Sequence, residues 1–415
     1  MKTQAEACLP FYLGGIQVNE PDHDHWMHCL KGHGMNTVSI TVYARQGDWD
    51  SAKLWYEAEE PFVMAEIRAA KAHGMKAVLI PRVALDSAFP RNAHLWHGMI
   101  MPQTDEQLEQ WFQIYRNYIL KWAEIAQEEK VDLFAIGSEL KALTHTLPQD
   151  KKMIETEAAD FQFWYESLPD RVIQAEGEPE KVELYHQDVL AMSRAYLSWG
   201  KQTYHPAQVM QQRRALLLDY WQDLIRAVRK IYSGRLIYAS NFDSYQNKGF
   251  WQQLDMMGIN AYFKLNHSIE ELPVSTLYQT VNNTWQSVFS DISRFRQEQG
   301  LESQSLLFTE IGFTRRKLAS VEPWSYGGKS VVESGEHSYL IDWDQQPLDD
   351  TERVESIRAL KNTVQQPQYR YFRGLLYWKL STVPEHRAIE PFMIYIGRGS
   401  MDPALDYLRQ IRQIH

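Results

Sequence analysis

The chain has 415 residues, of which 44% are hydrophobic and 13% aromatic, and its formal net charge at pH 7 is −10. This length allows one large domain or two ordinary ones. The negative charge argues against nucleic acid or an anionic membrane as the main partner.

The two cysteines, Cys8 and Cys29, are too few for a disulfide framework. The first fifteen residues lack the apolar segment of a signal peptide, and no run is long enough to span a membrane. We therefore expect a soluble protein, either cytoplasmic or secreted if an export signal has been removed.

Two similar segments lie forty residues apart. KGHGMNTVSITV starts at Lys31 and KAHGMKAVLIPRV starts at Lys71, and in each a helical pattern stops at a glycine before an apolar run. The same step recurs at Gly234 and Gly300. A glycine that ends a helix just before a short strand is typical of α/β proteins.

A capping box at Thr104 and Gln107 predicts the start of an amphipathic helix that runs to about residue 130. It leads into VDLFAIGSEL, a buried-strand pattern that ends in Glu139. Burial of an unpaired carboxylate is costly, so the position of this residue requires an explanation.

The pattern predicts eight strands, mostly short and apolar on both faces, with helices between them. They are residues 12–18, 37–42, 77–82, 133–138, 236–241, 257–262, 306–310 and 375–379. Parallel strands covered by helices have this pattern, and eight such units predict an α/β fold of the (β/α)8 TIM-barrel type. A doubly wound open sheet is the alternative, but no Gly-rich phosphate loop follows an early strand.

Residues 144–218 interrupt this order after the fourth strand. The segment is polar, helix-prone and dotted with aromatic residues. We interpret the whole chain as one catalytic domain, 1–415, with 144–218 as a helical insertion near the active-site face. Such an insertion serves either as a helical decoration for stability or oligomerisation or as a lid that faces the substrate. A second long loop, 314–351, follows the seventh strand.

Two glutamates end predicted strands. Glu139 follows the fourth strand, and Glu310 ends LLFTE in the seventh. The carboxyl ends of barrel strands meet at the active-site face, so both carboxylates are expected there. Paired carboxylates serve glycoside hydrolysis. We favour this catalytic role; by spacing alone, the alternatives for each glutamate are a metal ligand or half of a structural ion pair.

Five segments in barrel order resemble glycoside hydrolase family 113: VDLFAIGSEL, LIYASNFD, FWQQLDMMGINAYFKL, LLFTEIGF and GLLYWK. The resemblance covers about residues 34–379. It implies a retaining β-mannanase-type enzyme in which Glu139 matches the general acid/base and Glu310 the nucleophile. We expect a raised pKa for Glu139 beside the ionised Glu310.

The resemblance also implies substrate-binding residues. Tyr262 matches the tyrosine that hydrogen-bonds the nucleophile, and Trp378 matches the tryptophan that stacks on the sugar. Asn241 and Trp324 occupy positions that line the family's subsites. Barrel packing is the alternative role for each of them.

The sequence departs from the family pattern at two strand ends. Ile80-Pro81-Arg82 stands where the family tends to have Lys-Pro-His, and Asn241-Phe242 stands where it tends to have Asn-Trp. These differences leave the mechanism unchanged but make the sugar specificity uncertain.

Two arginines follow early strands, Arg82 after the third and Arg45 after the second. Each is a candidate substrate-binding residue that would favour an acidic sugar, because a guanidinium binds carboxylates in a bidentate manner. A salt bridge within the barrel rim is the alternative for both.

Other patterns carry less information. His23, His25, His28 and His33 lie close together, but polar loop and helix positions explain them better than a metal site. AIGSEL lacks the second glycine of an esterase nucleophile elbow. We expect a carbohydrate substrate, no metal and no cofactor. The rival hypothesis is a non-catalytic carbohydrate-binding barrel, and the oligomeric state is not predicted.

Overall fold

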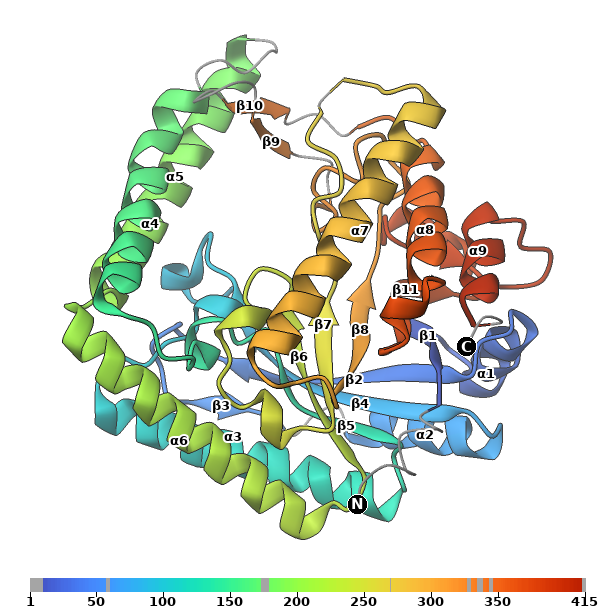
Figure 1. Cartoon of the computed structure of the whole chain (residues 1–415), viewed down its shortest axis with the longest axis horizontal. Coiled ribbons are helices and arrows are strands. Elements are labelled where there is room, and N and C mark those ends of the chain that lie inside the picture. Colours follow the sequence, from blue (N-terminus) through green and yellow to red (C-terminus); the bar gives the residue numbers. More distant parts are fainter. Residues whose placement is uncertain are drawn as a thin grey trace.

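The computed structural model describes residues 10–56, 60–172, 179–268, 270–326, 330–333, 339–342 and 346–412. In this part of the chain, parallel strands form a closed barrel, and β1 closes it by pairing with both the last strand and β2 (Figure 1). The barrel strands are β1 (Tyr12–Gln17), β2 (Thr37–Gln46), β4 (Lys76–Leu85), β5 (Leu133–Ser138), β6 (Arg235–Asn241), β7 (Met256–Asn260), β8 (Ser305–Ile311) and β11 (Phe372–Ser381).

The predicted (β/α)8 barrel is therefore confirmed, with small differences in strand length. β2 and β4 extend four and three residues beyond their predicted ends, because they stay paired in register as far as Gln46 and Leu85. The short β3 (Leu54–Trp55) pairs antiparallel with the end of β2. β7 ends at Asn260, so Tyr262 lies just beyond the strand.

Helices cover the outside of the barrel (Figure 1). They are α1 (His23–Gly32), α2 (Glu60–Ala72), α3 (Asp105–Glu128), α6 (Ala207–Ile231), α7 (Val274–Glu298), α8 (Thr351–Val364) and α9 (Pro403–Arg412). The capping box of α3 is present, with Thr104 accepting from the Gln107 amide. The step after β6 has two 3-10 turns, Tyr245–Asn247 and Trp251–Gln253, where the other steps have an α-helix.

The segment after β5 is helical. α4 (Lys151–Val172) and α5 (Pro179–Thr203) run side by side and rise beside the barrel (Figure 1). The next barrel helix, α6, begins at Ala207, within the segment 144–218 that we interpreted as the insertion. Within the loop after β8, β9 (Ser330–Glu333) and β10 (Tyr339–Asp342) form a hairpin, and β10 contacts α4.

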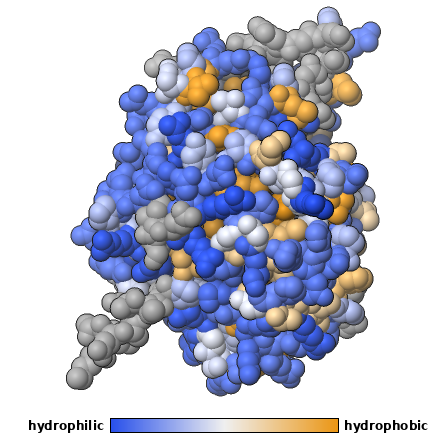
Figure 2. All heavy atoms as spheres, turned by 90° about the vertical axis from the view of Figure 1, so that its right-hand side faces the viewer, coloured by the Kyte–Doolittle hydropathy of each residue, from blue (hydrophilic) through white to orange (hydrophobic). Residues whose placement is uncertain are grey.

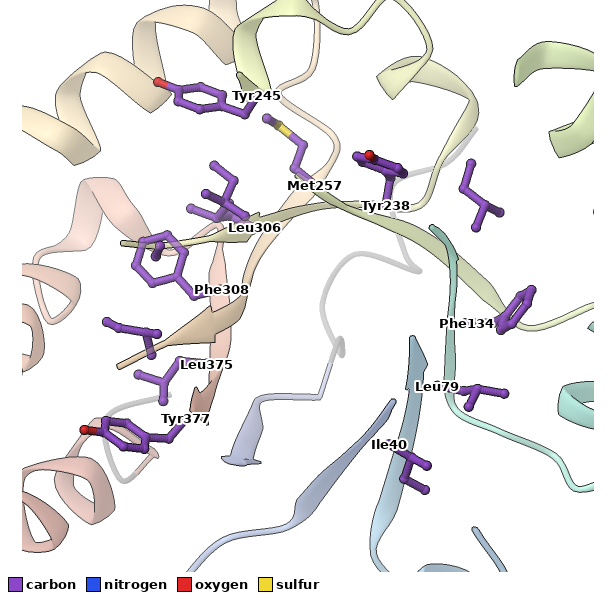
Figure 3. Close-up of a cluster of buried hydrophobic side chains, with 14 of the residues drawn as sticks. Ile40, Leu79, Phe134, Tyr238, Tyr245, Met257, Leu306, Phe308, Leu375 and Tyr377 are labelled. Atoms are coloured by element: carbon purple, nitrogen blue, oxygen red, sulfur yellow. The ribbon is translucent and has the colours of Figure 1, made fainter. Parts of the chain in front are cut away.

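Alternation along the strands divides the core into two layers. Ten residues fill the inside of the barrel, among them Val78, Leu133 and Leu307. Their chain neighbours, including Leu79, Phe134 and Leu306, point outward and pack under the helices (Figure 3). Successive side chains of a strand face opposite sides of the sheet. Because both faces of these strands are buried, one inside the barrel and one under the helices, the strands are apolar on both faces.

One face of the outer surface is shown in Figure 2. It is mostly hydrophilic, with smaller apolar areas between the polar ones. Among the helices that the structure describes, none combines the length and apolar character needed to cross a bilayer.

The closure of the barrel predicts one sensitive glycine. Gly14 pairs with Thr37 across the β1–β2 seam, and a methyl group at Gly14 would overlap the Thr37 carbonyl. We expect Gly14→Ala to lower the free energy of unfolding by about 3 kcal/mol, because the seam must open. Urea titration measures this change. Gly32→Ala, in the last turn of α1 with open space around it, should instead be neutral or stabilising by about 0.5 kcal/mol.

Candidate active site

Seven of the eight barrel strands contribute residues, near or just beyond their carboxyl ends, to one cavity of about 950 Å³. Six of these residues were singled out by the sequence: Arg82, Glu139, Asn241, Tyr262, Glu310 and Trp378. The mouth at the carboxyl ends of the strands is where barrel active sites lie. The structure therefore brings both glutamates into one cavity.

A β-bulge directs Glu310 into this cavity. The register between β7 and β8 shifts between Ile259–Phe308 and Asn260–Glu310, which leaves Thr309 as an extra residue. Under strict alternation, Glu310 would point outward with Phe308. A bulge changes the direction of the following side chain. Here it turns Glu310 inward, where the residue is 3% exposed and its carboxylate lies among polar groups.

Three side chains hold the Glu310 carboxylate. Tyr262 donates its hydroxyl to Oε2 at 2.9 Å, and Asn260 Nδ2 donates to Oε1 at 3.1 Å. Arg82 forms an ion pair with Oε1. Thr309 donates to Asn260 Oδ1 at 2.7 Å, which fixes the amide with its nitrogen towards Glu310. Such donors stabilise the ionised carboxylate and fix its orientation.

The backbone of Glu139 takes the left-handed conformation, with φ of 56°. This conformation is uncommon for a residue with a side chain. Hydrogen bonds hold it in place: the Glu139 amide donates to Ala239 O at 2.9 Å, and its carbonyl accepts from the Lys141 amide at 2.8 Å. The Leu140 amide donates to the Tyr238 hydroxyl at 2.8 Å. Glu139 is thus fixed from both sides at the mouth.

The pKa of Glu139 is low in the free protein, which corrects the expected rise. Burial alone would raise this pKa, but the hydrogen bond and charge of His97, the charge of Arg82 and a hydrogen bond from Asn260 lower it to about 2. His97 Nε2 lies 2.8 Å from Glu139 Oε2, and Arg82 lies 3.9 Å from the same oxygen. Sequence reasoning considered the negative charge of Glu310 but not these two partners.

The predicted sugar-contacting residues line the same cavity. The Arg82 guanidinium lies 5.2 Å from the centre of the Trp378 ring, and Lys379 lies 3.9 Å from it. Trp324 stacks on Phe242 with ring centres 5.3 Å apart and keeps 42% of its surface exposed. Each ring is thus held at the edge of the cavity with accessible area.

Arg45 does not belong to this group. Its side chain is exposed, and its backbone pairs with Trp55 of β3 beyond the barrel mouth. It is not among the residues that line the cavity. The extension of β2 past its predicted end carries Arg45 away from the site.

Sequence reasoning missed several residues of the site, Tyr43 of β2 among them. Asn260 lies two positions before Tyr262, so alternation along β7 was a usable signal. His97 lies in the 3-10 turn η3 (His97–Met99) between β4 and α3, and Tyr326 lies in the long loop after β8. Neither loop has a periodic pattern that would have identified them.

Two of the histidines near the N-terminus have other contacts. His25 contacts Cys29 at 3.6 Å and His33 contacts Ile396 O at 2.9 Å. In the described ranges, no group of three His, Cys, Asp or Glu side chains is arranged to hold a metal ion.

A (β/α)8 barrel whose fourth and seventh strands each present a glutamate to one cavity has the arrangement of a glycoside hydrolase. The comparison with protein families agrees. The profile of Glycoside Hydrolase Family 113 matches residues 16–196 and 207–354, and the chain belongs to this family. The match begins before the recognised motifs, ends before β11 and includes most of α4 and α5, which we had expected to interrupt it.

Solved structures give the same fold. The GH113 β-mannanase AaManA from Alicyclobacillus acidocaldarius, in complex with ManMIm, is 16% identical with a TM-score of 0.62, covering 98% of this chain and 99% of that one. A GH113 β-1,4-mannanase is 15% identical with a TM-score of 0.60, with the same coverage. A comparison with curated protein sequences found no match.

The low pKa of Glu139 predicts a contribution to acid stability. Its pKa is about 2 when folded and near 4.5 when unfolded, so the stabilisation is complete above about pH 4.5 and is lost as the pH falls towards 2. In this window, the unfolding free energy of Glu139→Gln should change less steeply with pH than that of the wild-type protein. The difference in slope should correspond to at most about one proton. Urea titrations between pH 2 and 6 measure this slope, and equal slopes would contradict the low pKa.

Proposed function

We propose that this glycoside hydrolase cleaves a β-linked, mannan-type polysaccharide or oligosaccharide with retention of configuration. The observation that carries the proposal is the buried Glu310 carboxylate, held by Tyr262, Asn260 and Arg82 in the same cavity as Glu139. The mannan substrate is supported by the family and by the β-mannanases of the same fold.

Glu310 is the proposed nucleophile. Its three donors keep it ionised, and they leave it facing the cavity for attack on the anomeric carbon. The guanidinium of Arg82 reaches both carboxylates, which favours the close spacing of a retaining enzyme over the wider spacing that accommodates an inverting water. Because Arg82 is engaged with both glutamates, we propose that it positions the nucleophile and is not reserved for an acidic sugar.

Glu139 is the proposed general acid and base. It protonates the departing oxygen in the first step and removes a proton from water in the second. Its low pKa in the empty cavity leaves it ionised at neutral pH. A bound sugar displaces water and favours the neutral carboxyl, so the proton is taken up as the substrate fills the site.

Trp378, Trp324 and Asn241 complete the proposed substrate surface. Aromatic faces pack on the apolar face of a pyranose, and an amide exchanges hydrogen bonds with hydroxyl groups. The proposal needs no metal or cofactor, because the two carboxylates supply both the covalent and the proton-transfer steps.

The first test is hydrolysis of a panel of neutral and acidic β-linked polysaccharides that includes linear β-1,4-mannan. We expect release of reducing sugar from the mannan, reduced by at least about 1,000-fold in Glu310→Gln. Binding without hydrolysis by the wild-type protein would instead support the rival carbohydrate-binding barrel.

The two glutamates should differ in their response to the leaving group. Glu139→Gln should lose most activity on mannan but keep its first step on an aryl mannoside with a good leaving group, because a phenolate needs no proton. Stopped-flow release of 4-nitrophenol measures that step. Glu310→Gln should be inactive on both substrates, and the opposite pattern would reverse the two roles.

His97 should set the pH range of activity. Its removal eliminates the hydrogen bond and the charge that lower the pKa of Glu139. In His97→Asn, we therefore expect the alkaline limb of kcat/KM to move to higher pH, since this profile reports the free enzyme. A profile that falls in height without moving would indicate a purely structural role for His97.

A further inference from the structure

The helical pair α4–α5 contributes aromatic side chains to the catalytic cavity. The aromatic wall consists of Phe161 and Tyr165 from α4, Tyr196 and Trp199 from α5, and Tyr204 after α5. Phe161 lies at its centre, with ring centres 4.8 Å from Tyr165 and 5.5 Å from Trp199. Gly200 permits this packing, because a methyl group there would lie 2.6 Å from the Phe161 ring.

Hydrogen bonds hold the aromatic wall against the barrel next to the catalytic cavity. Trp199 Nε1 donates to Met99 O at 2.8 Å, so α5 is tied to the 3-10 turn that carries His97. Arg214 of α6 donates to Glu157 of α4 at 3.0 Å. A wall fixed on two sides presents its rings to the cavity without the entropy cost of ordering a mobile loop.

The contacts around Glu139 indicate on which side of the cavity the aromatic wall lies. His97 binds Glu139 at 2.8 Å and belongs to the turn that Trp199 holds. Lys141, two residues after Glu139, also lines the cavity and pairs with Asp243 at 2.7 Å. The wall therefore lies on the Glu139 side of the cavity, and Figure 1 shows α4 and α5, the helices that carry most of it, rising beside the barrel.

A general acid stands beside the oxygen that leaves, so the departing sugar must lie on its side of the cavity. We propose that the aromatic wall binds the leaving sugar of a β-linked mannan-type chain. This inference rests on the proposed function. The flat rings suit the apolar face of a pyranose, while Glu157 and the Lys141–Asp243 pair offer charged partners to its hydroxyl groups.

Tyr165 is the residue that best tests the proposal. It lines the cavity, its ring lies 4.4 Å from that of Tyr196, and burial followed by the neighbouring Tyr196, Tyr204 and Asp243 raises the pKa of its hydroxyl. Tyr165 also lines the same cavity as the Lys141–Asp243 pair. A sugar between these groups would meet one aromatic face and several hydrogen-bond partners.

The experiment compares two substrates with the same glycone, β-1,4-mannohexaose and β-mannotriosyl fluoride. Fluoride is too small to reach the aromatic wall, so only the hexaose uses it. In Tyr165→Leu, which keeps apolar bulk but removes the flat ring, we expect the ratio of kcat/KM for hexaose to that for fluoride to fall about ten-fold. Tyr165→Phe should keep the ratio within about three-fold of wild type.

Phe163→Ala is the matched control, because Phe163 lies on the same helix, is 61% exposed and does not line the cavity. Its ratio should equal that of wild type, and thermal melts of all variants exclude unfolding. If Tyr165→Leu hydrolyses both substrates with an unchanged ratio, the proposal that the aromatic wall binds the leaving sugar is wrong, while the proposed function stands. Failure of the wild-type protein to hydrolyse either substrate would overturn the proposed function and this inference with it.

Discussion

Two carboxylates enclosed in one cavity repel each other, and the positive charge of Arg82 makes their coexistence possible. Burying an ion without a partner is costly. Removing one member of a buried ion pair therefore destabilises the fold by more than the pair itself stabilises it, because the other charge is left buried and unpaired. Arg82 is itself 7% exposed and has both glutamates as neighbours. It also affects the surrounding groups: burial and then the charge of Arg82 lower the pKa of Lys379 to about 8. The electrostatics of the site therefore depend on this guanidinium near the end of β4 together with His97, which is the nearer partner of Glu139.

The barrel was predictable because its physical signals are local. Each strand is a short run buried on both faces, and several helices end in a glycine just before the next strand. The capping box at Thr104 gave the start of α3 in the same local way. Glu139 was recognised because a carboxylate at the end of an apolar strand conflicts with burial unless the strand opens into a polar site.

What the sequence could not provide depends on register and on contacts between distant segments. No local pattern reveals the bulge at Thr309, without which alternation would turn Glu310 out of the barrel. The extension of β2 that removes Arg45 follows from its pairing with β4. His97 reaches Glu139 across 42 residues, so the sign of the pKa shift was not accessible before the fold was known.

The left-handed backbone of Glu139 has a consequence for how this position is maintained. Holding a side-chain-bearing residue at φ 56° costs of the order of 1 kcal/mol relative to glycine, which adopts that conformation freely. The backbone conformation alone would accordingly favour glycine here, directly after Ser138. A glutamate persists against this local preference because its carboxylate is the partner of His97 and Arg82 and because of its chemistry, so a glycine here would relax the backbone and at the same time leave both of these groups without that partner.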